Sequence, residues 1–234
     1  MLTLVDCKLR SIEKKTEPKM LRIPSEYLAK MGRYSIKIEG VEVEVKVVDV
    51  RSISIVTTHI IEMRSSLMKS SASSPRVVGV DIKQLTRGFA YVPEPSLLVL
   101  SAGANCLIVH LGPEFNTPSD VKAPEELINF LTDTSVCFVG STRRPPLLMY
   151  TSFWGVQAED LAATVLKKPS LLRSTLAELA QEAGVHYEGP SKGIGESLKV
   201  DSINPIVLTE DQVKLAVSDA YAYYKIGHKL LSSL

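Results

Sequence analysis

The clearest pattern in the chain is an alternation of apolar and polar residues between residues 34 and 50. Ile36 and Ile38 flank Lys37, and after Glu39-Gly40 every second residue is a valine, namely Val41, Val43, Val45 and Val47. A period of two residues puts the apolar side chains on one face of a strand. The pattern therefore predicts a β-hairpin with one buried face and one wet face, turning at Glu39-Gly40.

Four further segments are mostly apolar, as expected of strands that are covered on both faces. The first is the valine-rich run in residues 76–83, RVVGVDIK. Leu97–Ala102 and Cys106–Leu111 are joined around Gly103-Ala104-Asn105 and predict a second hairpin. Ser135–Gly140, SVCFVG, predicts one more buried strand.

Helical patterns lie between and after these strands. Short helices are predicted over Thr57–Met68, Pro124–Leu131 and Ser174–Ala183, and Gln157–Leu166 predicts a strand end followed by a short helix. The strongest helix signal begins at Thr209, whose spacing to Gln212 fits a capping box. An apolar stripe continues it through Val213, Val217, Ala220, Tyr221 and Tyr224. The polar residues Glu188–Asn204, and those directly after Lys83, predict loops.

This order of elements predicts an α/β fold with a mixed sheet and helices on its faces. The 234 residues suit one domain with an extension. Residues 1–33 are mixed and basic, and Pro18 and Pro24 interrupt them. We therefore expect an N-terminal extension over residues 1–33 and one domain over residues 34–234.

Composition and charge narrow the classes of function. The net charge is +1 without a basic block, which argues against a general duplex-DNA or polyanion binder but leaves room for a single-strand groove. The three cysteines, Cys7, Cys106 and Cys137, form no CxxC pair and no zinc spacing. An odd cysteine count, no signal peptide and no long apolar run predict an intracellular protein of nucleus or cytoplasm with no membrane span.

The candidate chemistry begins at Asp81 and Lys83. Side chains alternate along a strand, so these two point to the same face. Many phosphate-cleaving folds place two carboxylates at such positions to hold a divalent metal. Here the second residue is a lysine, and the alternative is an ordinary strand-end aspartate beside a solvated lysine.

The motifs VVGVDIK, LLVLSAGANCLIVHLG, PEELINFL with SVCFVG, AEDLAATVL and LTEDQVKLAVSDAYAYYKI stand in an order that resembles Werner-type 3′–5′ exonucleases. This family belongs to the DEDD superfamily with an RNase H-like fold, and the resemblance covers Val77 to Leu231. The leading hairpin and helix resemble those of stand-alone plant members. The resemblance implies a centre of four acids with two Mg²⁺ or Mn²⁺ ions about 4 Å apart. Asp81 matches the first acid and Asp219 the last.

The remaining positions depart from the family pattern. Lys83 replaces the second acid, and Leu215 stands one helical turn before Asp219, where the family commonly has a tyrosine. The third acid should follow SVCFVG, but residues 141–157 contain no Asp or Glu and carry Arg143 and Arg144 instead. Asp160 lies on a segment that the family uses structurally, so we do not assign it as a ligand. The site is therefore expected to be degenerate, with a weak metal at Asp81 and Asp219 if it holds one at all.

Three functions stay open at this point. The first is an impaired exonuclease-like protein that binds single-stranded RNA or DNA, or a nucleotide end, through Lys83, Arg143 and Arg144. The second is a pseudoenzyme that binds a protein partner, with Phe153-Trp154 as candidate contacts and a homo-oligomer as one form. The third is an active metal-dependent exonuclease. Under all three we expect Asp81 and Asp219 to share one cleft with Lys83 between or beside them.

Overall fold

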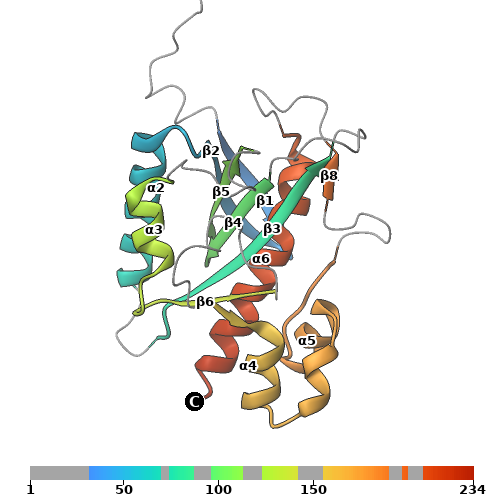
Figure 1. Ribbon diagram of the computed structural model, residues 1–234. Coiled ribbons are helices and arrows are strands. Elements are labelled where there is room, and N and C mark those ends of the chain that lie inside the picture. The colour runs from blue at the N-terminus through green and yellow to red at the C-terminus, as the bar shows by residue number, and fades with distance from the viewer. Residues whose placement is uncertain are drawn as a thin grey trace, which may run out of the picture.

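One mixed sheet contains all the strands in the part of the chain that the structure describes. The structure is a computed structural model, and it describes residues 32–69, 74–86, 96–112, 123–141, 155–189, 197–199 and 208–234 (Figure 1). The strands are β1 (Arg33–Ile38), β2 (Val41–Asp49), β3 (Val77–Thr86), β4 (Ser96–Ala102), β5 (Asn105–Leu111), β6 (Cys137–Gly140), β7 (Gly155–Gln157) and β8 (Ser197–Lys199). The helices are α2 (Ile53–Lys69), α3 (Glu125–Leu131), α4 (Ala158–Val165), the 3-10 helix η3 (Pro169–Arg173), α5 (Leu176–Glu182) and α6 (Glu210–Leu231).

The strand order across the sheet is β1-β2-β5-β4-β3-β6-β7, and β8 pairs with the far end of β3. The two predicted hairpins, β1–β2 and β4–β5, are antiparallel and confirmed. The first turns at Glu39 and Gly40, whose φ angles of 52° and 81° lie in the left-handed region that tight hairpin turns require. The hairpin is built into the sheet, because β2 pairs in parallel with β5 and places Val45 beside Cys106.

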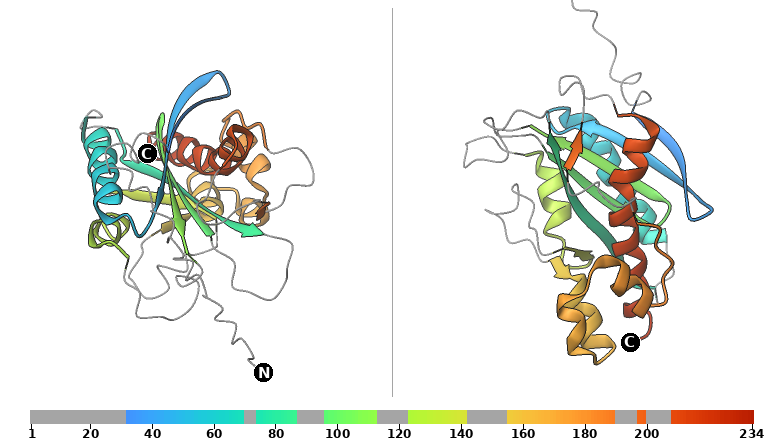
Figure 2. Two further views of the ribbon diagram at one scale, coloured as in Figure 1. Left: turned by 90° about the horizontal axis from the view of Figure 1, so that it is seen from above. Right: turned by 90° about the vertical axis from the view of Figure 1, so that its right-hand side faces the viewer.

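Helices cover both faces of the sheet (Figure 2). Helices α2 and α3 pack on one face around a core that includes Ile60, Phe130 and Phe138. Helix α6 crosses the other face and packs on strands β1 to β5, while its C-terminal half packs against α4, η3 and α5. The predicted α/β fold with helices flanking a mixed sheet is therefore confirmed.

The side chains of strand β3 point alternately toward these two cores, and this alternation builds the candidate site. Val78 and Val80 belong to the core under α2 and α3, whereas Leu85 belongs to the core under α6. Asp81 and Lys83 have the same parity as Leu85, so their side chains face α6. The polar pair is thereby presented to the one helix that carries Asp219.

Helix α6 approaches β3 so closely that only glycine fits at their crossing. A Cβ atom on Gly79 would lie 1.9 Å from the backbone oxygen of Ala220 and 2.5 Å from the backbone nitrogen of Tyr224. On the helix, Gly227 meets Val77 and Val139 in the same manner, at 2.9 and 2.7 Å. The contact of Gly79 with Ala220 fixes how closely α6 approaches the sheet, and Ala220 is the residue directly after Asp219.

Several predicted boundaries differ from the structure. Helix α2 begins at Ile53, four residues before the predicted start, because Ser52 accepts the first helical hydrogen bonds. Strand β3 continues to Thr86, where a loop was predicted, because β4 and β8 both pair with its end. The prediction of a loop over Glu188–Asn204 is wrong at β8, because β8 pairs with the end of β3. No helix among the described residues is long and apolar enough to cross a membrane. Residues 1–31 lie outside the described residues, so the boundary near residue 33 stays a prediction.

Candidate functional site

The ammonium group of Lys83 lies between two carboxylates. Its Nζ atom is 2.8 Å from Oδ2 of Asp81, which belongs to the same strand, and it also contacts Oδ2 of Asp219 on α6. Lys83 is only 6% exposed, so water cannot replace these contacts for its charge. The expected proximity of Asp81 and Asp219, with Lys83 between them, is confirmed by this geometry.

Burial and charge act on this group of three residues in opposite directions. Burial raises the pKa of Asp81; the Lys83 ammonium opposes this, and the Asp219 carboxylate adds to it, so the net shift is upward. Burial alone would lower the pKa of Lys83, but the two carboxylates raise it by more. Lys83 is therefore a firmly charged cation that neutralises part of an acidic pair.

A tyrosine that sequence reasoning missed completes the contacts of Asp219. The hydroxyl of Tyr187, which follows α5, donates a hydrogen bond to Oδ1 of Asp219 at 2.5 Å. Burial and this hydrogen bond raise the pKa of Tyr187, so the phenol stays a donor. Position 215, where the resemblance would place a tyrosine, holds Leu215, which packs against the apolar core beneath α6. Tyr187 lies 32 residues before Asp219 in the sequence, and no short spacing signals their contact.

Two lysines of α6 hold the backbone that carries Tyr187. Lys229 donates to the carbonyl of Gly184 at 2.6 Å, and Lys225 donates to the carbonyl of His186 at 3.0 Å. Lys225 also pairs with Glu39 in the turn of the β1–β2 hairpin. These hydrogen bonds hold the segment Gly184–Tyr187 against α6. Tyr187 is therefore positioned by the same helix that carries Asp219, its hydrogen-bond acceptor.

A second tyrosine and a third carboxylate lie near the same place. Burial, followed by the charges of Asp81, Glu159 and Asp219, raises the pKa of Tyr223, whose side chain also hydrogen-bonds Ser141. Tyr223 is one helical turn after Asp219, a spacing that was visible in the sequence. Oε2 of Glu159, at the start of α4, is buried and has no hydrogen-bond partner among the described residues. The neighbouring Asp160 is exposed.

The remaining predicted site residues lie outside the described residues. Arg143 and Arg144 follow Ser141, the last described residue after β6, by two and three positions. Phe153-Trp154, considered for a protein contact, also falls outside. Ser141 hydrogen-bonds Tyr223, whose pKa is also raised by the charges of Asp81 and Asp219, so the residue after β6 lies near the Asp81–Lys83–Asp219 group. The proposed binding roles of the two arginines stay predictions.

The residues at this site do not fit a pair of divalent metals. A two-metal centre needs several carboxylates that are free to bind cations about 4 Å apart. Here Asp81 and Asp219 share one ammonium, which is a fixed positive charge where a metal would bind. The described residues contain no group of three or more His, Cys, Asp or Glu side chains that could hold a metal ion.

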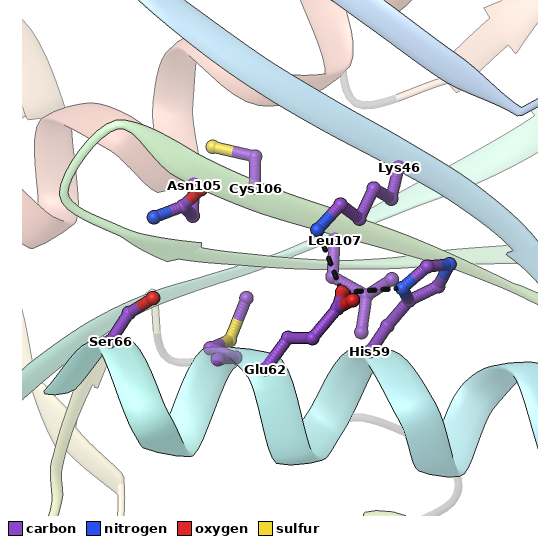
Figure 3. Close-up of a pocket in the computed structure, with 8 residues that line it drawn as sticks. Lys46, His59, Glu62, Ser66, Asn105, Cys106 and Leu107 are labelled. Atoms are coloured by element: carbon purple, nitrogen blue, oxygen red, sulfur yellow. Dashed lines mark hydrogen bonds and ion pairs between the residues drawn. The ribbon is translucent and has the colours of Figure 1, made fainter. Parts of the chain in front are cut away.

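A small pocket on the other side of the sheet carries an ion-pair network of its own (Figure 3). Glu62 on α2 accepts from Lys46 of β2 at 2.8 Å and lies 2.9 Å from Nδ1 of His59. The cavity has about 20 Å³, which is room for about one water molecule. Burial raises the pKa of the neighbouring Cys106 thiol to about 12, so this cysteine is inert. We interpret this pocket as a structural contact between α2 and the sheet.

A solved nuclease shares this fold. The chain is similar to a structure described as the apo form of the nuclease, with 12% sequence identity, 80% of each chain covered and a TM-score of 0.50. The fold is that of this solved nuclease. It is also similar to crystal structures of the EXD2 exonuclease domain, one soaked in Mn and Mg and one in Mg and dGMP. These share 22% and 23% identity, cover 80% of this chain and 89% of theirs, and have TM-scores of 0.38 and 0.37.

The fold assignment rests on the first of these likenesses. No family model matches the chain, and no curated protein matches it.

Proposed function

We propose that this chain is a nuclease-fold protein that binds single-stranded nucleic acid ends without cleaving them through a two-metal mechanism. The observation that carries the proposal is the ammonium of Lys83 between Asp81 and Asp219. We further propose that the chain is a degenerate, plant-type stand-alone member of the Werner-type exonucleases, on the motifs that it shares with them.

The loss of catalysis follows from the cost of freeing the two acids. Each would have to give up its contact with Lys83, and a buried ammonium left without a partner is strongly unfavourable. A divalent cation placed beside that ammonium would also meet a like charge within a few ångströms. Family-type hydrolysis is therefore the less favoured function, although the family uses Mg²⁺ or Mn²⁺ for it.

Nucleic-acid binding would depend on charges other than Lys83. The positive charge of Lys83 is matched by two carboxylates, so it has little left to attract a phosphate. Arg143 and Arg144 are two adjacent basic residues, and they follow β6, the strand next to β3 in the sheet. We propose that they contact the phosphates of a single strand, with Ser141 and Tyr223 at the start of that surface.

Fluorescence anisotropy with labelled single-stranded RNA and DNA, measured in chelator, tests this function. The parent protein should bind, and the double variant Arg143→Ala with Arg144→Ala should bind more weakly. Each phosphate contact contributes about 0.7 to the slope of log affinity against log salt for single strands, so the slope should fall by about 1.4. A matched double variant, Arg33→Ala with Arg51→Ala, removes two bases near the opposite edge of the sheet and should leave binding unchanged.

Either of two results would overturn the binding role. One is a parent protein that does not bind these strands even at low salt. The other is an arginine double variant with the affinity and salt slope of the parent.

A protein-interaction module is the second candidate, and one feature of α2 favours it. Ile53, Ile61 and Met68 are large apolar residues that are 62%, 52% and 54% exposed. At about 100° per residue they lie within about 80° of one another around the helix. A second copy of the chain would cover such a face. Light scattering should then give twice the chain mass of 25.6 kDa for the parent and the single mass for Ile61→Lys. A monomeric parent would contradict this candidate.

A further inference from the structure

A second cavity lies between the end of α2 and the C-terminal half of α6. It has a volume of about 200 Å³. Its walls come from four elements: Ser66 of α2, Val77 of β3, the turn from Gly103 to Asn105, and Tyr224 and His228 of α6. Ser66 and Asn105 also line the small pocket of Figure 3, where they lie at the end away from Lys46, Glu62 and His59.

This cavity is separate from the group around Lys83. Tyr224 lies five residues after Asp219, which places it about 140° around the helix axis at about 100° per residue. His228 is nine residues beyond Asp219, or about 13 Å along the helix at 1.5 Å per residue. None of the residues that contact Lys83 lines the cavity. A ligand here would therefore be bound independently of the two acids.

The lining chemistry indicates an uncharged ligand. Among the residues that the structure describes, those around the cavity include no Asp, Glu, Lys or Arg. A charged ligand would lose its hydration without gaining an opposite charge, which is costly. Hydrogen-bonding groups are nevertheless plentiful: the Ser66 hydroxyl, the Asn105 amide, the Tyr224 phenol and the His228 imidazole. Such a set suits a neutral molecule with several donors and acceptors.

The aromatic wall of the cavity indicates a flat ligand. The ring of Tyr224 has two aromatic neighbours, with centroid distances of 6.3 Å to Tyr221 and 5.7 Å to His228. The His228 ring is itself held, because its Nε2 atom lies 3.1 Å from the hydroxyl oxygen of Ser74. A cavity of about 150 Å³ already accepts one six-membered ring, so a volume of about 200 Å³ suits a one-ring or two-ring heterocycle.

We propose that this cavity binds a nucleobase, as a free nucleoside or as an unpaired base of a single strand. The base would lie along the fixed Tyr224 ring, with its polar edge on the Asn105 amide and the Ser66 hydroxyl. Amide side chains pair well with the donor and acceptor pattern of base edges, and aromatic rings stack on any base. The sugar would remain at the mouth, because the volume holds little more than the base.

Protein-observed NMR with adenosine, guanosine, cytidine and uridine tests this proposal. The backbone amides of Gly103 and Ala104 report on the cavity, and those of Asp81 and Lys83 report on the other site. Saturable shifts at Gly103 and Ala104, with at least one nucleoside and with none at Lys83, are expected. Ribose 5-phosphate, which has no base, should produce no shift at the turn.

Two variants and a control locate the binding. Asn105→Ala should weaken it about threefold to tenfold, the range expected for a lost neutral hydrogen bond. Tyr224→Phe keeps the ring and the fold while it removes the hydroxyl, and should retain the stacking part of the binding. Tyr187→Phe changes the other site and should leave the nucleoside affinity unchanged.

Oligonucleotides distinguish the two sources of the base. A six-residue single strand that shifts the turn amides at lower concentration than the nucleosides identifies a base within a strand as the ligand. A strand without effect, where a nucleoside binds, identifies the free nucleoside. The proposal is overturned when no nucleoside shifts these amides up to 10 mM, or when Asn105→Ala binds like the parent. Because the nucleosides lack phosphate, failure here leaves the proposed binding by Arg143 and Arg144 untouched.

Discussion

Lys83 shows how one residue decides what a strand end can do. A second carboxylate at this position would add an acid to a site that already holds Asp81 and Asp219. The lysine instead supplies a buried positive charge that both acids contact. The same three positions thereby form an internal ion-pair group, in which Lys83 neutralises part of the acidic pair and removes a place for a cation.

Lys83→Glu should reverse this exchange. The variant should bind Mn²⁺ more tightly than the parent, because a third carboxylate returns. It should be less stable in chelator, because three acids then share one buried site. Breaking a fully buried ion pair costs about 3–5 kcal/mol, and the cost here should be lower because the Asp219 side chain is still 17% exposed. Calorimetric titration with Mn²⁺ and thermal melts with and without metal measure both effects.

Lys83→Met is the matched control for that experiment. It should lose stability in chelator without gaining affinity for Mn²⁺. A Lys83→Glu protein that melts like the parent in chelator and binds no more metal would show that Lys83 has no special role.

The raised pKa of Lys83 predicts a loss of stability at alkaline pH. The folded state binds the proton of the Lys83 ammonium more tightly than the unfolded chain does, so the stabilisation by charged Lys83 is complete below its ordinary pKa of 10.5. This stabilisation is lost as the pH rises from 10.5 through the higher pKa of the folded state. Melting temperatures between pH 8 and 12 should therefore fall more steeply for the parent than for Lys83→Met. Parallel curves for the two proteins would contradict this assignment.

At the scale of residues, the positions of site residues could be predicted from the sequence where a strand period or a helix spacing linked them. The alternation of β3 placed Asp81 and Lys83 on one face, and the capped helix placed Asp219 opposite them. Tyr187 was missed because it reaches Asp219 through a turn after α5 that no pattern describes. Its contact depends on how Lys225 and Lys229 fasten the preceding backbone to α6.

At the scale of elements, α6 is the helix on which both the core and the site depend. Its capping box at Thr209 and Gln212 and its apolar stripe were readable in the sequence. The order of the strands in the sheet could not be predicted from the sequence. The parallel pairing of β2 with β5 joins segments about 60 residues apart and leaves no local signal. β8 was missed since three residues are too few to show a period.

Gly79→Ala should separate α6 from β3. A methyl group at this position would overlap the Ala220 carbonyl, which is backbone and cannot turn aside. Overpacking of this kind costs about 1–3 kcal/mol, and more where the backbone must move. Chemical denaturation measures the loss. Gly40→Asn is the control: its position has a φ of 81° and no neighbour within 4 Å, and asparagine tolerates that region, so stability should change little. Equal stability of the Gly79→Ala and parent proteins would contradict the close crossing.

Tyr187→Phe tests the segment that α6 holds. The variant loses a hydrogen bond to a charged acceptor, which contributes about 1.5–3 kcal/mol. Tyr34→Phe is the matched control, because its hydroxyl donates to the neutral carbonyl of Leu208 at 3.2 Å and should contribute about 0.5–1.5 kcal/mol. Urea denaturation of both variants should show the larger loss for Tyr187→Phe. The opposite order would mean that Tyr187 does not hold Asp219 in solution.

At the scale of the whole molecule, the chain combines the fold of a solved nuclease with a lysine between two acids. Folds host functions through their sites, and the same fold can lose one chemistry while its surface still binds. The mixed sheet and α6 bring Asp81 and Asp219 together. The residue between them is Lys83, so the fold alone does not predict cleavage.

The most direct test of this account is a 3′-end shortening assay with purified protein, 5′-labelled single-stranded RNA and DNA, and Mg²⁺ or Mn²⁺. The account predicts that the strands keep their full length, because Lys83 occupies the place between Asp81 and Asp219. Stepwise shortening from the 3′ end that disappears in Asp81→Ala would contradict it, and would show that the two acids still perform metal-dependent hydrolysis.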